Sequence, residues 1–513
     1  MTDTHVVKFA LIIAAIAAIL YIPILSADFV FDDIPQILTD SYIHNPSHFA
    51  EVLSLKVMSK DIIDNNRPVM LLSLMLDSVL WDKTPFGYHL TNLLLHSLYS
   101  AMVFILFYGI LSRLFPQNKN VLWGAFTGAV IFAIHPINSE AVSVITFRED
   151  LLAAFFTLLV LILAEKFPAE KTLTSFLLIA AIFISVFAAA GAKENGVIAP
   201  LYLLIYWLAV RKAGQWRTWV KLIGAGFAAT AIFMTLRFTA VPDKSVIFTE
   251  KAAYLGGSFS KMLAIQPRIW VYQLLELFRP SLLCADISGY SVRIISLQTA
   301  LIVLAIIIIL SAIISRKNMG FAVGTVFFVL AMLPTSNLVP IFRPIADRYL
   351  YLPMAGLCLA LASIICNLKT SKFLIISFIA IVSLSLCYYT VQRELVWQSG
   401  FSLWQDTVKK NPYSFTGNTN LGYAFFDGGE FEKAIRYFTK ASQLNPAEPE
   451  PIAGLAITYD ALGMTEDADK AFENAVLLDS RYADYDNLMQ LLLLTPEQGR
   501  KLEIIADRVT VKK

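Results

Sequence analysis

Charged residues are scarce in this chain, and their scarcity excludes most classes of soluble protein. Only 16% of the 513 residues are Asp, Glu, Lys or Arg, whereas 57% are hydrophobic. A composition this apolar at this length indicates a chain that crosses a membrane several times. The formal net charge is only +2, so the chain also lacks the excess of positive charge that nucleic-acid binding requires.

Cysteine is equally scarce. The chain has four, Cys284, Cys358, Cys366 and Cys387, and three of them fall inside apolar runs. None belongs to a Cys-x-x-Cys or Cys/His ligand pattern, so neither a disulfide framework nor a zinc site is predicted.

Long apolar runs are what the chain does have. We predict eleven membrane spans, which begin near Lys8, His89, Val121, Glu140, Leu173, Gly196, Trp219, Ser296, Gly320, Ile345 and Phe373. A further segment, from Lys261 to Phe278, contains Gln266, Pro267, Arg268 and Glu276. These groups are too polar for a helix that faces lipid, so we expect the segment to be interfacial or re-entrant.

Basic residues between the predicted spans set the topology, because positively charged loops stay on the cytoplasmic side. They cluster at Arg113/Lys119, Lys166/Lys171, Arg211/Lys212/Arg217/Lys221, Arg316/Lys317 and Lys369/Lys372. These five loops share one side only if the Lys261 segment does not cross. The chain beyond the last span then faces the periplasm of a bacterial inner membrane, or the lumen of the endoplasmic reticulum in a eukaryote.

The apolar runs end near Arg393, which predicts a membrane domain over 1–392 and a soluble domain over 393–513. In the soluble part, Gly422, Gly429, Ala434, Phe438, Ala441 and Pro446 recur 34 residues later as Ala456, Gly463, Ala468, Phe472, Ala475 and Ser480. Small residues at this period predict two tetratricopeptide repeats, at about 415–448 and 449–482. We expect a half repeat before them and a capping helix after them. The predicted fold is all-α, a polytopic helix bundle followed by an α-solenoid.

Four charged motifs interrupt the apolar pattern on the predicted outer face: Phe31-Asp32-Asp33, Arg148-Glu149-Asp150, Lys193-Glu194 and Asp347-Arg348. Ionisable groups near a membrane are costly and usually face a site. Asp32 or Asp33 could act as a general base or bind a cation. The cations Arg148, Lys193 and Arg348 suit the phosphate of a lipid. Ion pairing among Arg148, Glu149, Lys193 and Glu194 is the alternative.

Further polar residues belong to the predicted outer ends of the spans. His89, Asn92 and His96 share one face of a helix, where they could line a site or hydrogen-bond to neighbouring helices.

Taken in order, the motifs resemble the transmembrane and tetratricopeptide-repeat O-mannosyltransferases and their bacterial relatives, in the GT-C class of polytopic glycosyltransferases. The motifs that carry the resemblance are Phe-Val-Phe-Asp-Asp at Phe29 to Asp33, Asn66-Arg67-Pro68, Pro-Phe-Gly-Tyr-His-Leu-Thr-Asn at Pro85 to Asn92, His-Pro-Ile-Asn-Ser-Glu-Ala-Val at His135 to Val142, Arg148-Glu149-Asp150, Lys193-Glu194-Asn195-Gly196 and Asp347-Arg348-Tyr349-Leu350-Tyr351-Leu352-Pro353. The repeats follow them.

The resemblance implies transfer of a sugar from a polyprenyl-phosphate-linked donor to a Ser or Thr hydroxyl of an acceptor protein. It implies that Asp32 or Asp33 serves the acceptor. We expect an inverting single displacement, with the donor phosphate bound by Arg148, Lys193 and Arg348. The expected site-lining residues are Arg67, His89, Asn92, His135, Glu140, Glu149, Glu194 and Tyr349. A divalent cation, Mg or Mn, on Asp32 and Asp33 is left open as a cofactor.

Two departures from the animal members bear on the donor. Asp347 stands where a glutamate is expected, and Glu149 where a small residue is usual, so the sugar need not be mannose. A ligase or polymerase that uses a lipid-linked oligosaccharide, and a membrane-anchored repeat scaffold without catalytic activity, are the alternative functions. A transporter is disfavoured because no inverted repeat is evident.

Overall fold

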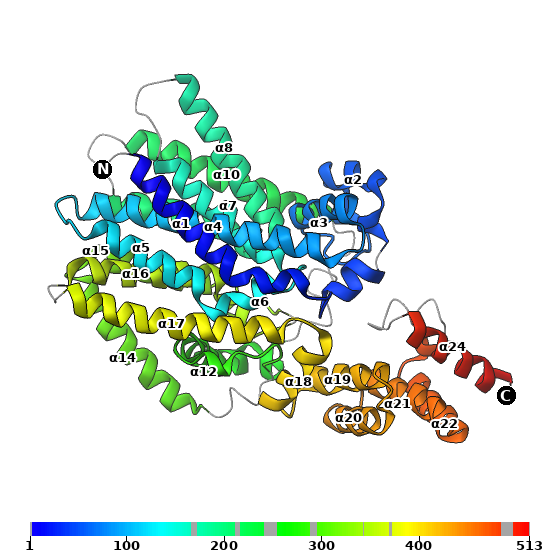
Figure 1. The fold of residues 1–513 in the computed structure, drawn as a ribbon. Coiled ribbons are helices and arrows are strands. Elements are labelled where there is room, and N and C mark those ends of the chain that lie inside the picture. Colours follow the sequence, from blue (N-terminus) through cyan, green and yellow to red (C-terminus); the bar gives the residue numbers. More distant parts are fainter. Residues whose placement is uncertain are drawn as a thin grey trace. The chain divides into compact units, whose positions relative to one another are not determined.

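The computed structural model describes residues 3–39, 41–165, 172–210, 216–240, 254–287, 295–341, 343–368, 372–483 and 496–511. These residues form helices and connecting turns, with no strand among them (Figure 1). The chain divides into two compact units. The first comprises Met1–Ala27, Ser41–Leu283 and Ile295–Leu395, and the second comprises Asp28–Asp40, Cys284–Ile294 and Val396–Lys513.

A helix occurs at the position of each predicted span: α1 (Asp3–Tyr21), α4 (Pro85–Leu114), α5 (Val121–Ile134), α7 (Arg148–Glu165), α8 (Thr172–Ala192), α9 (Ala199–Val210), α10 (Trp216–Ala240), α14 (Leu297–Ser315), α15 (Met319–Met332), α16 (Tyr351–Asn367) and α17 (Lys372–Val396). By length and composition, 7 described helices could cross a membrane, or up to 8 if α5 and the bent segment after it form one span. The protein is therefore a multi-pass membrane protein.

The helices at the other predicted spans fall outside this count for local reasons. α9 and α15 have only 12 and 14 residues, and α7 begins with three charged residues. The eighth candidate is bent by 47° where α5 meets Pro136–Ser143, because Pro136 lacks the backbone N–H that would continue the helix.

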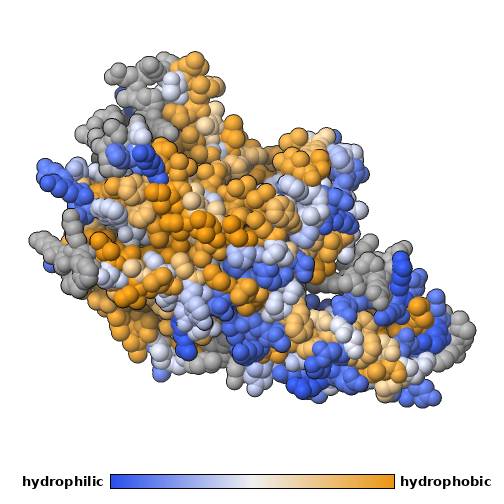
Figure 2. All heavy atoms as spheres, viewed as in Figure 1, coloured by the Kyte–Doolittle hydropathy of each residue, from blue (hydrophilic) through white to orange (hydrophobic). Residues whose placement is uncertain are grey.

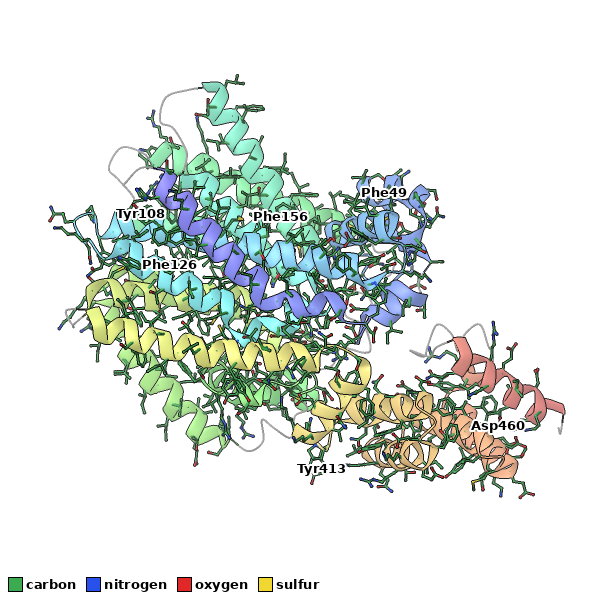
Figure 3. The ribbon with its side chains drawn as sticks, in the orientation of Figure 1. Phe49, Tyr108, Phe126, Phe156, Tyr413 and Asp460 are labelled. Carbon is green, nitrogen blue, oxygen red and sulfur yellow. The ribbon has the colours of Figure 1, made fainter. Side chains whose placement is uncertain are left out.

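Apolar side chains predominate over the helices of the first unit on the face that Figure 2 shows. Leu173, Ile308 and Leu384 are each more than 60% exposed, as expected for side chains that face lipid. Inside, aromatic rings fill the contact of α1 with α4 and α5. The ring of Phe9 lies 5.2 Å from that of Phe126, which Figure 3 labels.

The backbones of α15 and α16 approach each other at two glycines. A Cβ atom on Gly324 would lie 2.6 Å from the backbone oxygen of Gly356, and one on Gly356 would lie 2.4 Å from the backbone nitrogen of Phe328. Small residues allow such close packing between membrane helices. The contact fixes α16, and with it the short 3-10 helix η10 (Asp347–Leu350) at its start.

The segment that we expected not to cross the membrane is helix α12 (Phe259–Phe278). It is not among the helices that could span by length and composition. Two glycines precede it in the left-handed region, Gly256 at φ 78° and Gly257 at φ 82°. Glu276, near its C-terminal end, is completely buried.

The second unit contains the predicted repeats. The helix pairs are α19 (Phe415–Asp427) with α20 (Phe431–Leu444), and α21 (Glu450–Ala461) with α22 (Thr465–Leu478); α18 (Gly400–Lys410) precedes them and α24 (Pro496–Val511) follows them. Phe438 is buried between Gly422 and Gly454, where added Cβ atoms would lie 2.7 and 2.5 Å from its ring. Gly422 is one of the recurring small residues, and this packing explains why a small residue is needed there.

The last helix covers the repeats, as expected of a capping helix. Leu502 and Ile505 of α24 are fully buried. Arg508 lies 2.8 Å from Asp460 of α21 and 2.7 Å from Asp469 of α22.

Some residues on which the topology depends lie outside the described segments, namely Lys166, Lys171, Arg211, Lys212 and Lys369. The side of the membrane that each loop faces stays a prediction.

Candidate functional site

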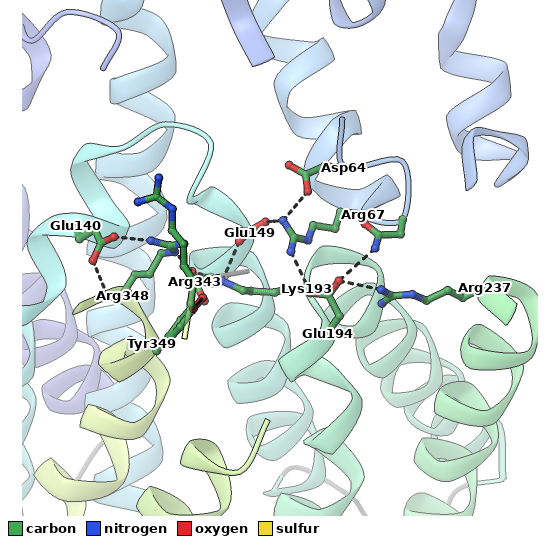
Figure 4. Close-up of polar contacts among 12 residues, drawn as sticks. Asp64, Arg67, Glu140, Glu149, Lys193, Glu194, Arg237, Arg343, Arg348 and Tyr349 are labelled. Atoms are coloured by element: carbon green, nitrogen blue, oxygen red, sulfur yellow. Dashed lines mark hydrogen bonds and ion pairs between the residues drawn. The ribbon is translucent and has the colours of Figure 1, made fainter. Parts of the chain in front are cut away.

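Three of the four charged motifs meet in one cluster of the first unit (Figure 4). We call this cluster the ion network. It consists of Asp64, Arg67, Glu140, Glu149, Asp150, Lys193, Glu194, Arg237 and Arg348. Residues more than 200 positions apart in sequence converge in this network.

Arg67 connects three carboxylates at one end of the network. It directly precedes α3 (Pro68–Trp81), and its Nη1 lies 2.6 Å from Asp64 Oδ1 and also contacts Glu149. Its Nη2 lies 3.2 Å from Glu194 Oε2. Burial alone would lower the pKa of Arg67, but the three carboxylates outweigh burial and raise that pKa above its usual value.

Glu194 begins the short helix η7 (Glu194–Ile198) and accepts from two further donors. Arg237 Nη2 lies 3.0 Å from its Oε1, and the Asn66 amide donates to the same oxygen at 3.3 Å. Burial would raise the pKa of Glu194, but Arg67 and Arg237 more than compensate and lower it.

Lys193 lies in the middle of the network and is almost completely buried, with 6% of its surface exposed. Its Nζ is 2.8 Å from Glu149 Oε1 and 2.5 Å from Asp150 Oδ2. Burial opposes the charged ammonium, yet Asp150 and Glu149 outweigh it and raise the pKa of Lys193. The ammonium also lies 5.2 Å from the centre of the Tyr349 ring.

Arg348 forms the other end of the network and comes from η10. Its backbone N–H and its Nη1 both donate to Glu140, at 2.9 and 2.5 Å. Its Nε lies 3.8 Å from Asp150 Oδ2, and its guanidinium lies 3.7 Å above the ring of Phe147. Asp150 therefore lies between the two cations Lys193 and Arg348.

Arg148, the third predicted phosphate-binding cation, has a different environment. It is completely buried, and its Nη2 lies 2.6 Å from Asp77 of α3. It also donates to the Asn92 side chain at 2.6 Å and to the backbone oxygens of Tyr88 at 2.9 Å and Ser73 at 3.2 Å. This arrangement fits the ion-pairing alternative, with Asp77 as a partner that we did not anticipate.

The polar side chains predicted to line the site mostly connect helices. Asn92 donates to Val142 O at 3.1 Å, and His96 bonds to the Tyr351 hydroxyl at 2.9 Å. His135 accepts from the Ile137 N–H and donates to Leu277 O at 3.0 Å, so its Nε2 carries a proton. Two other site-lining candidates are also buried, His89 with 0% and Tyr349 with 8% of its surface exposed.

Asp32 and Asp33 belong to the second unit. They follow Phe31, which has a positive φ of 59° and whose ring lies 5.2 Å from Trp404 of α18. Asp33 is completely buried, and its Oδ2 accepts from Val30 N–H at 3.4 Å, whereas Asp32 is only half-buried. The expected meeting of these carboxylates with Lys193 and Arg348 stays a prediction.

Sequence reasoning missed a second buried group of charges in the first unit. Glu276 of α12 faces Asp347, and Arg393 Nη2 lies 3.7 Å from Asp347 Oδ2. Burial, followed by the charge of Asp347, raises the pKa of Glu276 well above its usual value. An acidic residue within the apolar end of α12 was the one signal that could have identified this group.

In the part of the chain that the structure describes, no three His, Cys, Asp or Glu residues are placed to hold a metal ion. Asp32 and Asp33 thus have no third ligand of these types there.

Comparison with known proteins adds the evolutionary context. Residues 425–492 match the model of the tetratricopeptide repeat family. Over 461 residues the chain is 27% identical to protein O-mannosyl-transferase F38B6.6 of Caenorhabditis elegans, covering 86% of this chain and 63% of that protein. The predicted resemblance is confirmed. The chain resembles the protein O-mannosyl-transferases over most of its length.

Human protein O-mannosyl-transferase TMTC3 is 25% identical over 518 residues, covering 92% of this chain and 55% of that protein. The chain thus spans somewhat more than half the length of these relatives. Among solved structures, ArnT from Cupriavidus metallidurans bound to undecaprenyl phosphate superposes with a TM-score of 0.40 at 13% identity, covering 94% of this chain and 81% of that one. That score is too low to establish a common fold.

Proposed function

We propose that this protein is a glycosyltransferase that moves a sugar from a polyprenyl-phosphate-linked donor to Ser or Thr hydroxyls of an acceptor protein. The proposed location is the periplasmic face of a bacterial inner membrane, or the lumenal face of the endoplasmic reticulum in a eukaryotic host. The relatives named as protein O-mannosyl-transferases support the reaction class, and the ion network supports the donor class.

One observation carries the donor assignment. Lys193 and Arg348 come from different helical segments, and both contact the same carboxylate, Asp150, at 2.5 and 3.8 Å. Two cations that share one carboxylate oxygen are close enough together to share a phosphate as well. Tyr349, beside both cations, adds an aromatic surface.

In this proposal Lys193 and Arg348 stabilise the negative charge that grows on the departing lipid phosphate. The transition state at the anomeric carbon has oxocarbenium character, as in glycoside hydrolysis. Preorganised cations are most effective where water is excluded. Removal of one such contact typically costs on the order of 10²- to 10³-fold in rate.

The acceptor hydroxyl requires a base, and we assign this role to Asp32. Asp32 is half-buried, whereas Asp33 is fully buried and its carboxylate accepts from the Val30 N–H within its own turn. Asp32 takes the hydroxyl proton as the oxygen attacks, and a single displacement inverts the anomeric centre. Phosphate is a good leaving group, so the step requires no general acid.

The repeats of the second unit are proposed to hold the acceptor protein. Tetratricopeptide arrays usually offer an extended concave surface to a peptide segment. This role is separate from the chemistry of transfer. Variants of the repeats should therefore raise the acceptor concentration needed for half-maximal transfer, without changing the rate at which the donor is hydrolysed.

The test compares glycoproteins of the host after deletion of the gene and complementation at matched expression. Wild type is compared with Asp32→Asn, Asp33→Asn and the control Asp406→Asn, which alters a carboxylate paired with Lys410 on α18. We expect a Ser/Thr-linked glycan to be lost with Asp32→Asn and kept with the control. An unchanged glycoproteome would refute protein O-glycosylation by this chain.

The glycan found in the same strains distinguishes transfer of a single sugar from transfer of an oligosaccharide. Transfer of an oligosaccharide, with release of a polyprenyl pyrophosphate, would identify a ligase. Washed membranes assayed with and without EDTA test whether a divalent cation takes part.

A further inference from the structure

The cations of the ion network are already paired with carboxylates. Arg67 contacts Asp64, Glu149 and Glu194. Lys193 contacts Glu149 and Asp150, and Arg348 contacts Glu140 and Asp150. A lipid phosphate that binds Lys193 and Arg348 therefore competes with buried carboxylates.

The charges of the network leave no surplus of cations for an added anion. Arg67, Lys193, Arg237 and Arg348 face the five carboxylates Asp64, Glu140, Glu149, Asp150 and Glu194. Figure 4 shows Arg343 close by, with its backbone oxygen bonded to the Tyr349 hydroxyl at 2.8 Å. If Arg343 is included, five cations face five carboxylates and the group is neutral. A bound phosphate would therefore give the group a net negative charge.

Asp150 is the carboxylate that such a phosphate would leave without partners. It is 3% exposed, and its Oδ2 contacts both Lys193 and Arg348, the two cations that would turn to the phosphate. Glu149 keeps Arg67, and Glu140 keeps the backbone N–H of Arg348. A buried carboxylate without a cation, beside a second carboxylate, takes up a proton because the charged form is too costly.

We propose that binding of a lipid-linked phosphate to Lys193 and Arg348 is coupled to the uptake of one proton by Asp150. The inference rests on the proposed function, because it concerns the same donor site. The ligand class is a prenyl phosphodiester, and the proton comes from solvent. Asp150 thereby becomes the residue that sets how donor affinity depends on pH.

Every charged or titratable group that faces Asp150 enters this coupling. Glu149 lies on the same helix, Lys193 precedes η7, and Arg348 belongs to η10. The hydroxyl groups of Tyr349 and Tyr351 are close enough to interact electrostatically with Lys193 and Asp150, respectively. Of these groups only the carboxylates carry a negative charge that a proton can neutralise, and Asp150 is the one whose two cations are both withdrawn.

The test measures binding of a polyprenyl methyl phosphate to the full-length protein in detergent micelles, between about pH 6 and pH 9. This diester does not titrate in that range, so any pH dependence belongs to the protein. If binding takes up one proton, linkage predicts that the affinity of wild type falls by up to about tenfold for each unit by which the pH rises. Asp150→Asn should bind with nearly constant affinity, and the control Asp406→Asn should behave like wild type.

A second measurement requires no variant. Calorimetric titration of wild type in two buffers with different ionisation enthalpies, at one pH in the sloping range, should show uptake of close to one proton per ligand. Dimethyl phosphate, which lacks the prenyl chain, should bind far more weakly than the prenyl diester. Equal binding would instead indicate a site for a free anion and would overturn the lipid assignment.

The outcomes separate the inference from the function on which it rests. Binding with a pH-independent affinity and no proton uptake would overturn the coupling alone. A pH slope that persists in Asp150→Asn would show that another group takes the proton. Absence of prenyl phosphate binding at every pH would refute the donor site itself, and the coupling with it.

Discussion

Arg348 binds Glu140 through two separate groups, its backbone N–H at 2.9 Å and its guanidinium Nη1 at 2.5 Å. One carboxylate thus fixes both the start of η10 and the direction of the guanidinium. Glu140 lies on α6 (Ser139–Ser143), the short helix after the bend that follows α5. The bend therefore supplies the group that orients the arginine.

From this contact we predict that Glu140→Gln lowers the rate of sugar transfer by about 10²-fold, since small misplacements of a catalytic group have effects of this size. The amide can still accept from the Arg348 N–H, but it lacks the charge that holds the guanidinium. Initial rates in membranes at matched expression measure the effect. A rate within twofold of wild type would show that Arg348 is oriented without Glu140.

The buried pair of Arg148 and Asp77 makes a different prediction. Asp77→Asn should lower the free energy of unfolding by about 3–5 kcal/mol, because it leaves a buried guanidinium without its carboxylate. The double variant Arg148→Met/Asp77→Leu should regain most of this loss. Thermal unfolding in detergent micelles gives the stability of both.

The double variant also decides the role of Arg148. We expect it to retain sugar transfer, because Arg148 is enclosed between α3, α4 and α7 rather than in the ion network. A double variant that is stable but inactive would restore the predicted phosphate-binding role.

The glycine contact between α15 and α16 predicts a loss of stability from a single methyl group. Gly324→Ala would place its Cβ 2.4 Å from the backbone nitrogen of Ala360, so the two helices must move apart. Overpacking of this kind costs about 1–3 kcal/mol. Gly224→Ala on α10 is the matched control, because no atom lies within 4 Å of an added Cβ there. Equal melting temperatures for the two variants would contradict the proposed contact.

The repeats should become less stable as pH rises, because of Glu450 at the start of α21. Burial, followed by the charge of Glu448, raises the pKa of Glu450 from 4.5 to about 7. An acid whose pKa is raised by folding favours the folded state below 4.5, and this contribution is lost as pH rises through about 7. Glu450→Gln should remove this dependence.

Hydrogen exchange of peptides from the repeats in the full-length protein measures this effect, with wild type and variant compared at the same pH. The two should exchange alike at about pH 5, and the variant should be better protected at about pH 8. Greater protection of wild type at the higher pH would contradict the assignment to Glu450.

The arrangement of helices and repeats could be predicted from the sequence, because apolar run length and the 34-residue period reflect local packing. The convergence of Glu149, Lys193 and Arg348 was also within reach, because all three lie at the predicted outer ends of spans. The bend after α5 and the shortness of α9 and α15 could not be predicted, because they depend on how helices pack.

The separate surroundings of Arg148 could not be predicted from its motif. Consecutive residues on a helix point about 100° apart, so Arg148 reaches Asp77 while Glu149 and Asp150 reach Lys193. Asp64, Arg237 and Glu276 had no motif to mark them. Their roles depend on segments that meet only in the folded chain.

The contact of Phe31 with Trp404 joins the segment Asp28–Asp40 to the compact unit that contains the repeats. Asp28 N–H strengthens this attachment by donating to Gln398 O at 3.0 Å. Asp32 and Asp33 therefore belong to the same unit as the repeats, although the chain places them directly after its first apolar helix. A protein segment held on the repeats would be held by the same unit that carries these carboxylates.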